Sequence, residues 1–241
     1  MVTPIKIVSI IVPVYNERDS IAMILEKIDR VNFINGIQKQ VIVVDDASDD
    51  GSNEVLNKII SSFNNGTYIN VRLDKNTGKG SAIHKGIELA SGEYMVVQDA
   101  DLEYDPEEIN YLLDPVIKVG ADVVYGSRFM GHFPHRVLFF WHSLGNKFLT
   151  MLSNAFTNLN LTDMETCYKL IRTDLIKGIH LKEKRFGFEP EVTAKLSKIP
   201  GIKFYEVGIS YYGRTYAEGK KIDWKDGLRA IYCIIRYNLF G

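Results

Sequence analysis

The sequence has little of several features that mark well-known protein classes. Its two cysteines, Cys167 and Cys233, cannot form a disulfide framework and fit a reducing compartment. It has no run of about 18 apolar residues, so the sequence predicts no transmembrane helix. An apolar run begins close to the first residue, which leaves no room for a signal peptide. We therefore expect a cytoplasmic protein.

An excess of charge of either sign is also absent. The 241 residues include 29 Lys and Arg against 30 Asp and Glu, for a formal net charge of −1. A nucleic-acid-binding protein is normally strongly basic, so nucleic acid is not an expected partner. Hydrophobic residues make up 46% and charged residues 24% of the chain, which excludes a disordered or collagen-like protein.

The charges are nevertheless segregated along the chain. Residues 93–114 include eight acids and no Lys or Arg, whereas residues 123–162 include no acid at all. The near-zero net charge is therefore the sum of segments of opposite sign. This pattern predicts one site for a cation and another for an anion.

Apolar runs and helical spacing alternate over the first half of the chain. We expect strands at 6–14, 40–44, 68–73, 93–98 and 121–125, with amphipathic helices between them. Such alternation predicts an α/β fold with a mostly parallel central sheet covered by helices on both faces. Ligands of such sheets bind at the carboxyl ends of the strands.

Two amphipathic helices are expected after this alternation stops, over residues 137–159 and 224–239. The first of them contains no acid, and the second has its basic residues away from its apolar stripe. The pattern leaves two alternatives open: each stripe packs on the sheet, or it lies on a membrane surface.

Two carboxylates, Asp99 and Asp101, come directly after the fourth expected strand, and Glu103 follows them. Carboxylate oxygens suit Mg²⁺ or Mn²⁺, which take their remaining ligands from phosphates and water. The alternative is a solvated loop before a helix, because acids are also favoured at helix N-termini. The position at a strand end favours the metal site.

Two further polar segments end or follow strands. Asp45 and Asp46 can accept hydrogen bonds from a nucleoside, or can form a turn that caps the next helix. The Gly-rich turn around Lys79 opens a helix, where backbone N–H groups and the lysine can hold a phosphate.

These motifs stand in an order that is similar to one enzyme family. They are VPVYNE (12–17), VVDDASDDGS (43–52), NTGKGSAIHKG (76–86), DADLEYDPE (99–107) and GSRF (126–129). The set resembles the family 2 glycosyltransferases of the GT-A fold, and within them the dolichol-phosphate mannose synthase and polyprenyl-phosphate glycosyltransferase group. The resemblance implies a GDP- or UDP-sugar donor, a divalent cation and a polyprenyl or dolichyl phosphate acceptor.

The resemblance also implies roles for individual residues. The expected nucleotide-sugar site consists of Pro13, Tyr15, Glu17, Asp45, Asp46, Lys79, Asp99 and Asp101. The expected ligands of Mg²⁺ or Mn²⁺ are Asp99, Asp101 and Glu103, although the mannose synthases commonly have Gln at the last position. The expected acceptor-phosphate site consists of Arg128, Arg136, Ser143, Asn146, Arg214 and Lys220. The residues expected to act in catalysis are Asp101, Arg128, Arg136 and Arg214.

Charge then suggests a mechanism. A phosphate acceptor is already an anion, so it needs positioning by arginines more than a general base, and direct displacement inverts the anomeric centre. A hydroxyl acceptor would instead need a carboxylate base, for which Glu191 and Asp101 are the candidates. Asp163 is expected to be structural, and Glu189 and Glu191 to line the site. A non-catalytic nucleotide-sugar-binding subunit is the third alternative.

The expected organisation is one GT-A domain over residues 1–221, followed by an amphipathic helix over 222–241. Within the domain, residues 1–127 form the nucleotide-sugar half and 128–221 the acceptor half. The acceptor implies a location at the inner face of the membrane, with the membrane surface and a membrane-anchoring subunit as further partners.

Overall fold

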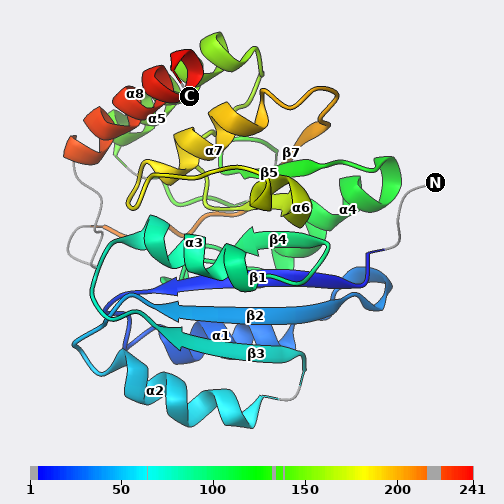
Figure 1. Ribbon diagram of the computed structural model, residues 1–241, viewed down its shortest axis with the longest axis vertical. Coiled ribbons are helices and arrows are strands. Elements are labelled where there is room, and N and C mark those ends of the chain that lie inside the picture. Colours follow the sequence, from blue (N-terminus) through cyan, green and yellow to red (C-terminus); the bar gives the residue numbers. More distant parts are fainter. Residues whose placement is uncertain (1–4, 64, 132–133, 138, 216–223, 241) are drawn as a thin grey trace.

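The computed structural model of the chain describes residues 5–63, 65–131, 134–137, 139–215 and 224–240. Within these residues a seven-stranded sheet forms the centre of the molecule (Figure 1). Its strands are β1 (Ile7–Val14), β2 (Gln38–Asp45), β3 (Thr67–Arg72), β4 (Tyr94–Val97), β5 (Val123–Ser127), β6 (Lys169–Arg172) and β7 (Phe204–Gly208).

The strand order is β3-β2-β1-β4-β6-β5-β7. All neighbouring pairs are parallel except those of β6, which runs antiparallel to β4 and β5. The predicted mostly parallel α/β sheet is therefore confirmed. The strands β6 and β7 were not expected from the sequence.

Helices cover both faces of the sheet: in Figure 1, α3 lies in front of it, against β1 and β2, and α1 lies behind it at the level of β2 and β3. The helices are α1 (Ile21–Arg30), α2 (Ser52–Ile59), α3 (Lys79–Leu89), α4 (Ile109–Val119), α5 (Phe140–Thr157), α6 (Thr173–Lys177), α7 (Phe188–Leu196) and α8 (Trp224–Leu239). Three short 3₁₀ turns lie at Ile34–Gly36, Ile60–Ser62 and Pro106–Glu108.

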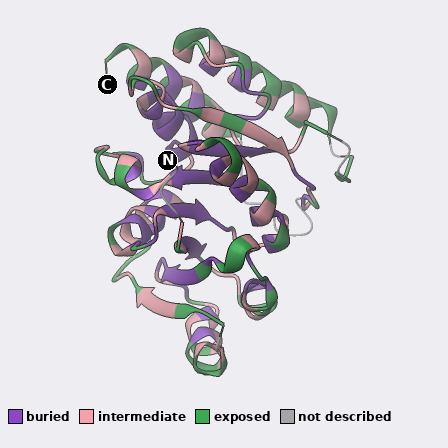
Figure 2. Ribbon diagram, turned by 90° about the vertical axis from the view of Figure 1, so that its right-hand side faces the viewer, coloured by how far each residue is buried: buried purple, intermediate pink, exposed green. Residues whose placement is uncertain are grey.

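The core follows from the apolar runs of the sequence. In β1 every residue after Ile7 is buried, as expected for a strand covered by helices on both faces. One face of α1 packs into the same core through Ile21, Ile24, Leu25 and Ile28. Figure 2 shows that buried residues are concentrated in the strands and in the inner faces of the helices.

The two amphipathic helices lie side by side at the end of the molecule beyond β7 (Figure 1). The buried residues of α5 are Thr150 and Ser153, whereas Trp141 is 76% exposed. Helix α8 buries Cys233 and Ile234 but leaves Trp224 72% exposed. Much of each apolar stripe therefore faces away from the protein, so the alternative that both stripes pack fully on the sheet is wrong. In the described part of the chain, no helix has the length and hydrophobicity needed to cross a bilayer.

Candidate active site

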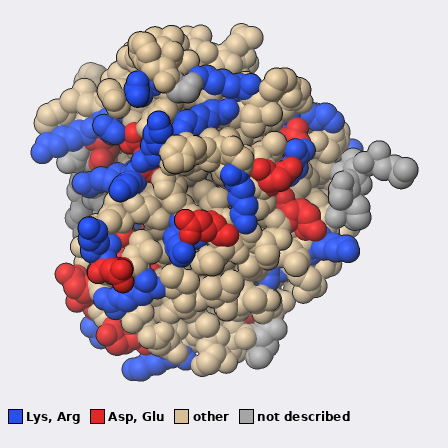
Figure 3. Space-filling view, in the orientation of Figure 1, with Lys and Arg blue, Asp and Glu red and all other residues tan. Residues whose placement is uncertain are grey.

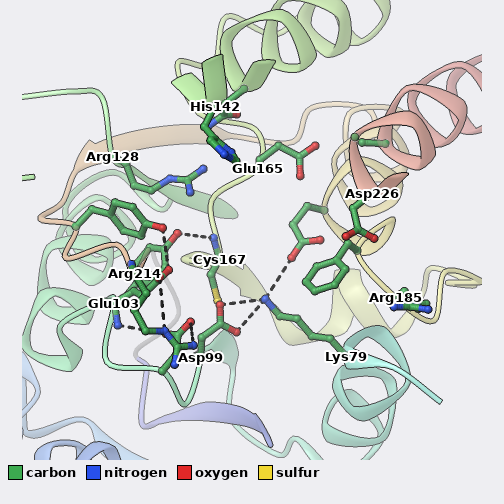
Figure 4. A pocket seen from close by; sticks show the side chains of 18 of the residues that line it. Lys79, Asp99, Glu103, Arg128, His142, Glu165, Cys167, Arg185, Arg214 and Asp226 are labelled. Carbon is green, nitrogen blue, oxygen red and sulfur yellow. Dashed lines mark hydrogen bonds and ion pairs between the residues drawn. The ribbon is translucent and has the colours of Figure 1, made fainter. Parts of the chain in front are cut away.

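A cavity of about 1290 Å³ opens where β1 and β4 end, beneath α5 and α8. It gathers side chains from the first strand, the acidic loop after β4, the start of α5 and the loop after β7 (Figure 4). Most of the residues that sequence analysis assigned to a site line it. They are Pro13, Tyr15, Glu17, Asp46, Lys79, Asp99, Asp101, Glu103, Arg128, Arg136, Ser143, Asn146 and Arg214.

Three of the expected residues are not in this group: Asp45, Lys220 and Glu191, the last of which is described below. Asp45 is fully buried, and its Oδ1 accepts a hydrogen bond from the backbone N–H of Ser48 at 2.9 Å. It therefore shapes the turn after β2 and does not face the cavity. Lys220 lies outside the described residues, so its role stays a prediction.

Asp46 holds the Gly-rich turn in place beside the cavity. Its carboxylate accepts from the backbone N–H of Thr77 at 3.0 Å and of Gly78 at 2.7 Å. Gly78 has a φ of +103°, and a Cβ there would lie 2.5 Å from the carbonyl oxygen of Lys184. A glycine is required here because only its backbone adopts this φ and lets the 184 segment approach so closely.

Lys79 projects from the start of α3 into the cavity, as Figure 4 shows. Its Nζ lies 2.9 Å from Oδ1 of Asp99 and 3.6 Å from Oε1 of Glu189. Burial disfavours the charged lysine, but Asp99 and Glu189 outweigh it and hold the pKa of Lys79 well above its ordinary value. Lys79 is therefore a fixed positive charge beside the acidic loop.

Arg214 lies on the other side of the acidic loop. Its Nη2 is 3.2 Å from Oδ2 of Asp101 and 3.5 Å from Oε1 of Glu17. Burial raises the pKa of Asp101 to about 7, with further contributions from the carboxylates of Asp99 and Glu103 and opposition from Arg214. The loop thus holds more negative charge than its protein partners neutralise.

Both oxygens of Glu103 are engaged by the segment that follows β7. Oε1 accepts from the backbone N–H of Arg214 at 2.6 Å, and Oε2 accepts from the hydroxyl of Tyr211 at 2.8 Å. Its backbone carbonyl also accepts from the N–H of Tyr212 at 3.0 Å. Glu103 therefore positions Arg214, and its expected role as a metal ligand stays a prediction.

The residues of the acidic loop fit a divalent cation of the magnesium type. No cluster of three or more His, Cys, Asp or Glu that could enclose a metal occurs within the described residues. Mg²⁺ commonly binds through one or two carboxylates together with substrate phosphates. Asp99 and Asp101 supply two carboxylates at the cavity wall, where burial and then the charge of Asp99 raise the pKa of Asp101.

Arg128 follows β5 and is fixed by a buried carboxylate. Its Nε lies 2.6 Å from Oδ2 of Asp163, and its Nη2 lies 2.7 Å from Oδ1. Asn146 of α5 donates to the same Oδ1 at 3.2 Å. The structural role expected for Asp163 is confirmed, because it sets the orientation of Arg128 at the cavity wall.

Apolar side chains form the outer part of the cavity, next to Arg128 and Arg136. Four of these side chains lie on α5 or in the segment before it, and one lies at the start of α8: Val137, Phe139, Trp141, Leu149 and Trp224. The backbone N–H of Arg136 donates to Tyr211 O at 2.8 Å, and its Nη1 donates to Gly213 O at 3.0 Å. We call these five apolar residues the apolar lip. The two arginines and the apolar lip therefore line the same cavity.

The prediction for Glu191 is wrong, whereas Glu189 does line the cavity. Glu191 is fully buried and accepts from the backbone N–H groups of Lys182 and Glu183 and from Nζ of Lys195. Glu165 also lines the cavity and was not expected from the sequence. No signal marked it, because a single Glu in an irregular segment has no characteristic spacing.

Comparisons with known proteins agree with the motifs. The family model described as glycosyl transferase family 2 matches residues 9–179. A dolichol-phosphate mannosyltransferase of Pyrococcus furiosus is 30% identical over 95% of this chain and 64% of its own length. An undecaprenyl-phosphate 4-deoxy-4-formamido-L-arabinose transferase of Aeromonas hydrophila is 27% identical over 90% of this chain and 64% of its own length. The chain thus spans less than two thirds of the length of these relatives.

Solved structures share the fold at low sequence identity. Glucosyl-3-phosphoglycerate synthase from Mycobacterium tuberculosis, in complex with Mn²⁺, UDP and phosphoglyceric acid, gives a TM-score of 0.69 at 16% identity. That match covers 98% of this chain and 80% of the other. TarS of S. aureus in complex with UDP-GlcNAc gives 0.59 at 19% identity, over 96% and 66% of the two chains. The GT-A fold is therefore confirmed, and the chain belongs to glycosyl transferase family 2.

Proposed function

We propose that this protein transfers a sugar from a nucleotide-sugar donor to a polyprenyl phosphate at the membrane surface. One observation carries the proposal: a single cavity joins an acidic loop, an oriented arginine and an apolar lip, represented by Asp99, Arg128 and Trp141. A nucleotide sugar with its cation suits the first part, an acceptor phosphate suits the second, and a prenyl chain suits the third.

The donor half is proposed to lie in residues 1–127 and the acceptor half in 128–221, with 222–241 as a membrane-contacting helix. In the donor half, Pro13, Tyr15 and Glu17 would contact the nucleoside above the end of β1. Asp46 would act indirectly, because its carboxylate holds the Gly-rich turn that presents Lys79.

Asp99 and Asp101 would hold Mg²⁺ or Mn²⁺, which neutralises the pyrophosphate of the donor. Lys79 contacts Asp99 at 2.9 Å, so its ammonium group would lie near the same diphosphate and stabilise the charge that develops on it. This pairing also keeps Lys79 protonated while no donor is bound. The protein therefore supplies a positive charge before the reaction begins.

The acceptor phosphate would be positioned by Arg128 and Arg136, with Ser143 and Asn146 on α5 close to them. Asp163 engages Nε and Nη2 of Arg128, which fixes the plane of the guanidinium at the cavity wall. A phosphate is an anion at neutral pH, so positioned arginines and direct attack on the anomeric carbon suffice, with inversion. Arg214 is held beside Asp101, where both substrates would meet.

The surface around the cavity supports a membrane location. The apolar residues of α5 and α8 that face outward adjoin Lys147, Lys225 and Arg236. Figure 3 shows Lys and Arg side chains gathered on the upper part of the molecule, where α7 and α8 lie in Figure 1. Apolar side chains flanked by basic ones suit the interface of an anionic membrane. Attachment at the inner face of the membrane and a membrane-anchoring subunit both remain predictions.

The proposal is tested with radiolabelled GDP-mannose, UDP-glucose and UDP-N-acetylglucosamine, each offered with polyprenyl phosphate vesicles and Mn²⁺ or Mg²⁺. We expect label from one donor to enter the lipid phase, and the Asp99→Asn variant to abolish this transfer. Label that enters a soluble saccharide offered in a parallel reaction, and not the lipid, would favour the hydroxyl-acceptor alternative. Donor binding without any transfer would favour the non-catalytic alternative.

A further inference from the structure

Glu165 lies at the cavity wall in the loop between α5 and β6, and its neighbours fix it there. Two residues before it, Asp163 pairs with Arg128. On its other side, Thr166 donates through Oγ1 to the carbonyl of Gly126 at 2.5 Å, and the backbone N–H of Cys167 donates to the Tyr104 hydroxyl at 3.2 Å. The Glu165 side chain therefore projects from a rigid part of the wall.

One oxygen of the Glu165 carboxylate is not satisfied by the protein. Among the described residues, its Oε1 is one of the few buried side-chain oxygens without a hydrogen-bond partner. Leaving a buried acceptor without a donor is costly, and such groups in native proteins need an explanation. None of the steps proposed above uses this carboxylate.

Its position gives the explanation. Figure 4 shows Arg128, Glu165 and Lys79 around the same cavity, and the charges of Arg128 and Glu189 both act on Glu165. Glu189 in turn lies 3.6 Å from Nζ of Lys79. Arg128 is the proposed partner of the acceptor phosphate, and Lys79 is the proposed partner of the donor pyrophosphate. The sugar must lie between the two phosphates, because its anomeric carbon is bound to one and attacked by the other. The sugar ring therefore meets the wall that contains Glu165.

We propose that Glu165 recognises the sugar of the donor, and that this sugar is a neutral hexose whose hydroxyl groups donate hydrogen bonds to the carboxylate. The inference rests on the function proposed above. Hydroxyl groups supply the donors that Oε1 lacks. Glu189 and Asp99 line the same cavity, so a uronic acid would bring a further negative charge to a wall that is already acidic.

The test measures binding by calorimetry at pH 9, where Glu165 is ionised because its pKa is about 8, with Mg²⁺ for UDP, UDP-glucose, UDP-glucuronic acid, GDP and GDP-mannose. The variants are Glu165→Ala and Glu165→Gln, and the control is Glu54→Ala, an exposed glutamate on α2. The decisive quantity is the affinity for a nucleotide hexose divided by the affinity for the matching diphosphate. We expect Glu165→Ala to lower this ratio about 10- to 100-fold, the usual effect of losing a hydrogen bond to a charged group. The control leaves the ratio unchanged.

Two further results follow from the same charge. The parent protein should bind UDP-glucuronic acid more weakly than UDP-glucose, and Glu165→Gln should reduce that difference because it removes the negative charge. Normal diphosphate affinity with an unchanged ratio in Glu165→Ala would overturn this inference alone, and would also show that the variant is folded. Absence of UDP and GDP binding to the parent would instead contradict the proposed function, and this inference with it.

Discussion

Arg128 and Asp163 lie 35 residues apart in the sequence and form a two-pronged ion pair at the cavity wall, with distances of 2.6 and 2.7 Å. Asp163 is fully buried, and its carboxylate also accepts from the backbone N–H of Arg128 at 3.1 Å. Burial opposes ionisation, but Arg128 overcomes it and lowers the pKa of Asp163 below its ordinary value. The pair therefore couples stability to the orientation of the proposed acceptor site.

This coupling determines which Arg128 variant is informative. Removing either partner leaves a buried charge alone, so Arg128→Ala or Asp163→Ala should lower the free energy of unfolding by about 3–5 kcal/mol. Arg128→Lys keeps the charge but loses the planar fork. We expect it to lower sugar transfer about 100-fold, the usual effect of losing one oriented donor, with nucleotide binding unchanged.

Transfer rates, nucleotide affinity and urea unfolding are measured together for these variants. Arg30→Lys serves as the control, because Arg30 forms only an exposed pair with Glu26 on α1. Full transfer activity in Arg128→Lys would show that Arg128 does not position the acceptor phosphate.

The ionisation of Glu165 predicts a pH dependence of stability. Burial and the nearby Glu189 raise the pKa of Glu165 to about 8, whereas an unfolded Glu titrates near about 4.3. Between these values the folded state binds the extra proton, so this group makes the protein less stable as the pH rises.

Glu165→Gln removes this contribution. The variant should match the parent near pH 4.5 and exceed it above pH 8 by about 1–3 kcal/mol, the cost of an unsatisfied buried polar group. Urea unfolding at both ends of this range checks it. A variant that is less stable than the parent at high pH would show that Glu165 stabilises the fold instead.

Lys39 does not line the cavity, so replacing it should change the stability of the protein and not its activity. Its Nζ donates to the carbonyls of Ile28, Asp29 and Val31 at 2.6–2.7 Å, where α1 ends. Lys39→Met keeps the apolar stem but removes a donor from each of these carbonyls, of which those of Asp29 and Val31 still accept from Asn65. The free energy of unfolding should therefore fall by about 3 kcal/mol. Urea unfolding of this variant is compared with that of Lys58→Met, in which the replaced lysine is exposed. Equal stabilities would exclude this capping role.

The exposed tryptophans of α5 and α8 predict membrane binding. Trp141→Ser combined with Trp224→Ser should weaken flotation with anionic vesicles about 10-fold or more, because less apolar surface enters the interface. The control is Met23→Ser on α1, which is also exposed but lies in a different helix. If the double variant floats as well as the control, α5 and α8 do not bind the membrane through these tryptophans.

The parts of the fold that the sequence predicted are those with continuous apolar runs. β1 and β2 are buried on both faces, so their composition alone distinguishes them from surface segments. The strands β6 and β7 were missed because they are short and contain charged residues. Lys169 in β6 is nevertheless buried, with its Nζ 4.7 Å from the centre of the Tyr125 ring. Tertiary contacts of this kind override local propensity.

For the candidate site too, some features could be predicted from the sequence and others could not. Residues in ordered motifs, such as Lys79, Asp99 and Arg128, were predicted because each follows a strand end, where a parallel sheet places its ligands. Pairings between distant segments could not be predicted, since neither Glu103 with Arg214 nor Arg128 with Asp163 has a characteristic spacing. The sequence also left open whether the apolar stripe of α5 packs on the sheet or lies on a membrane, because helical spacing shows only that one face of the helix is apolar.

The central claim is that the acceptor is a lipid-linked phosphate. The most direct test compares initial rates of sugar transfer to a polyprenyl phosphate and to the polyprenol of the same length, which has the same chain but lacks the phosphate. Because Arg128 and Arg136 line the cavity on its proposed acceptor side, we expect the phosphate to react at least about 100-fold faster. Equal rates, or faster transfer to the polyprenol, would contradict the claim.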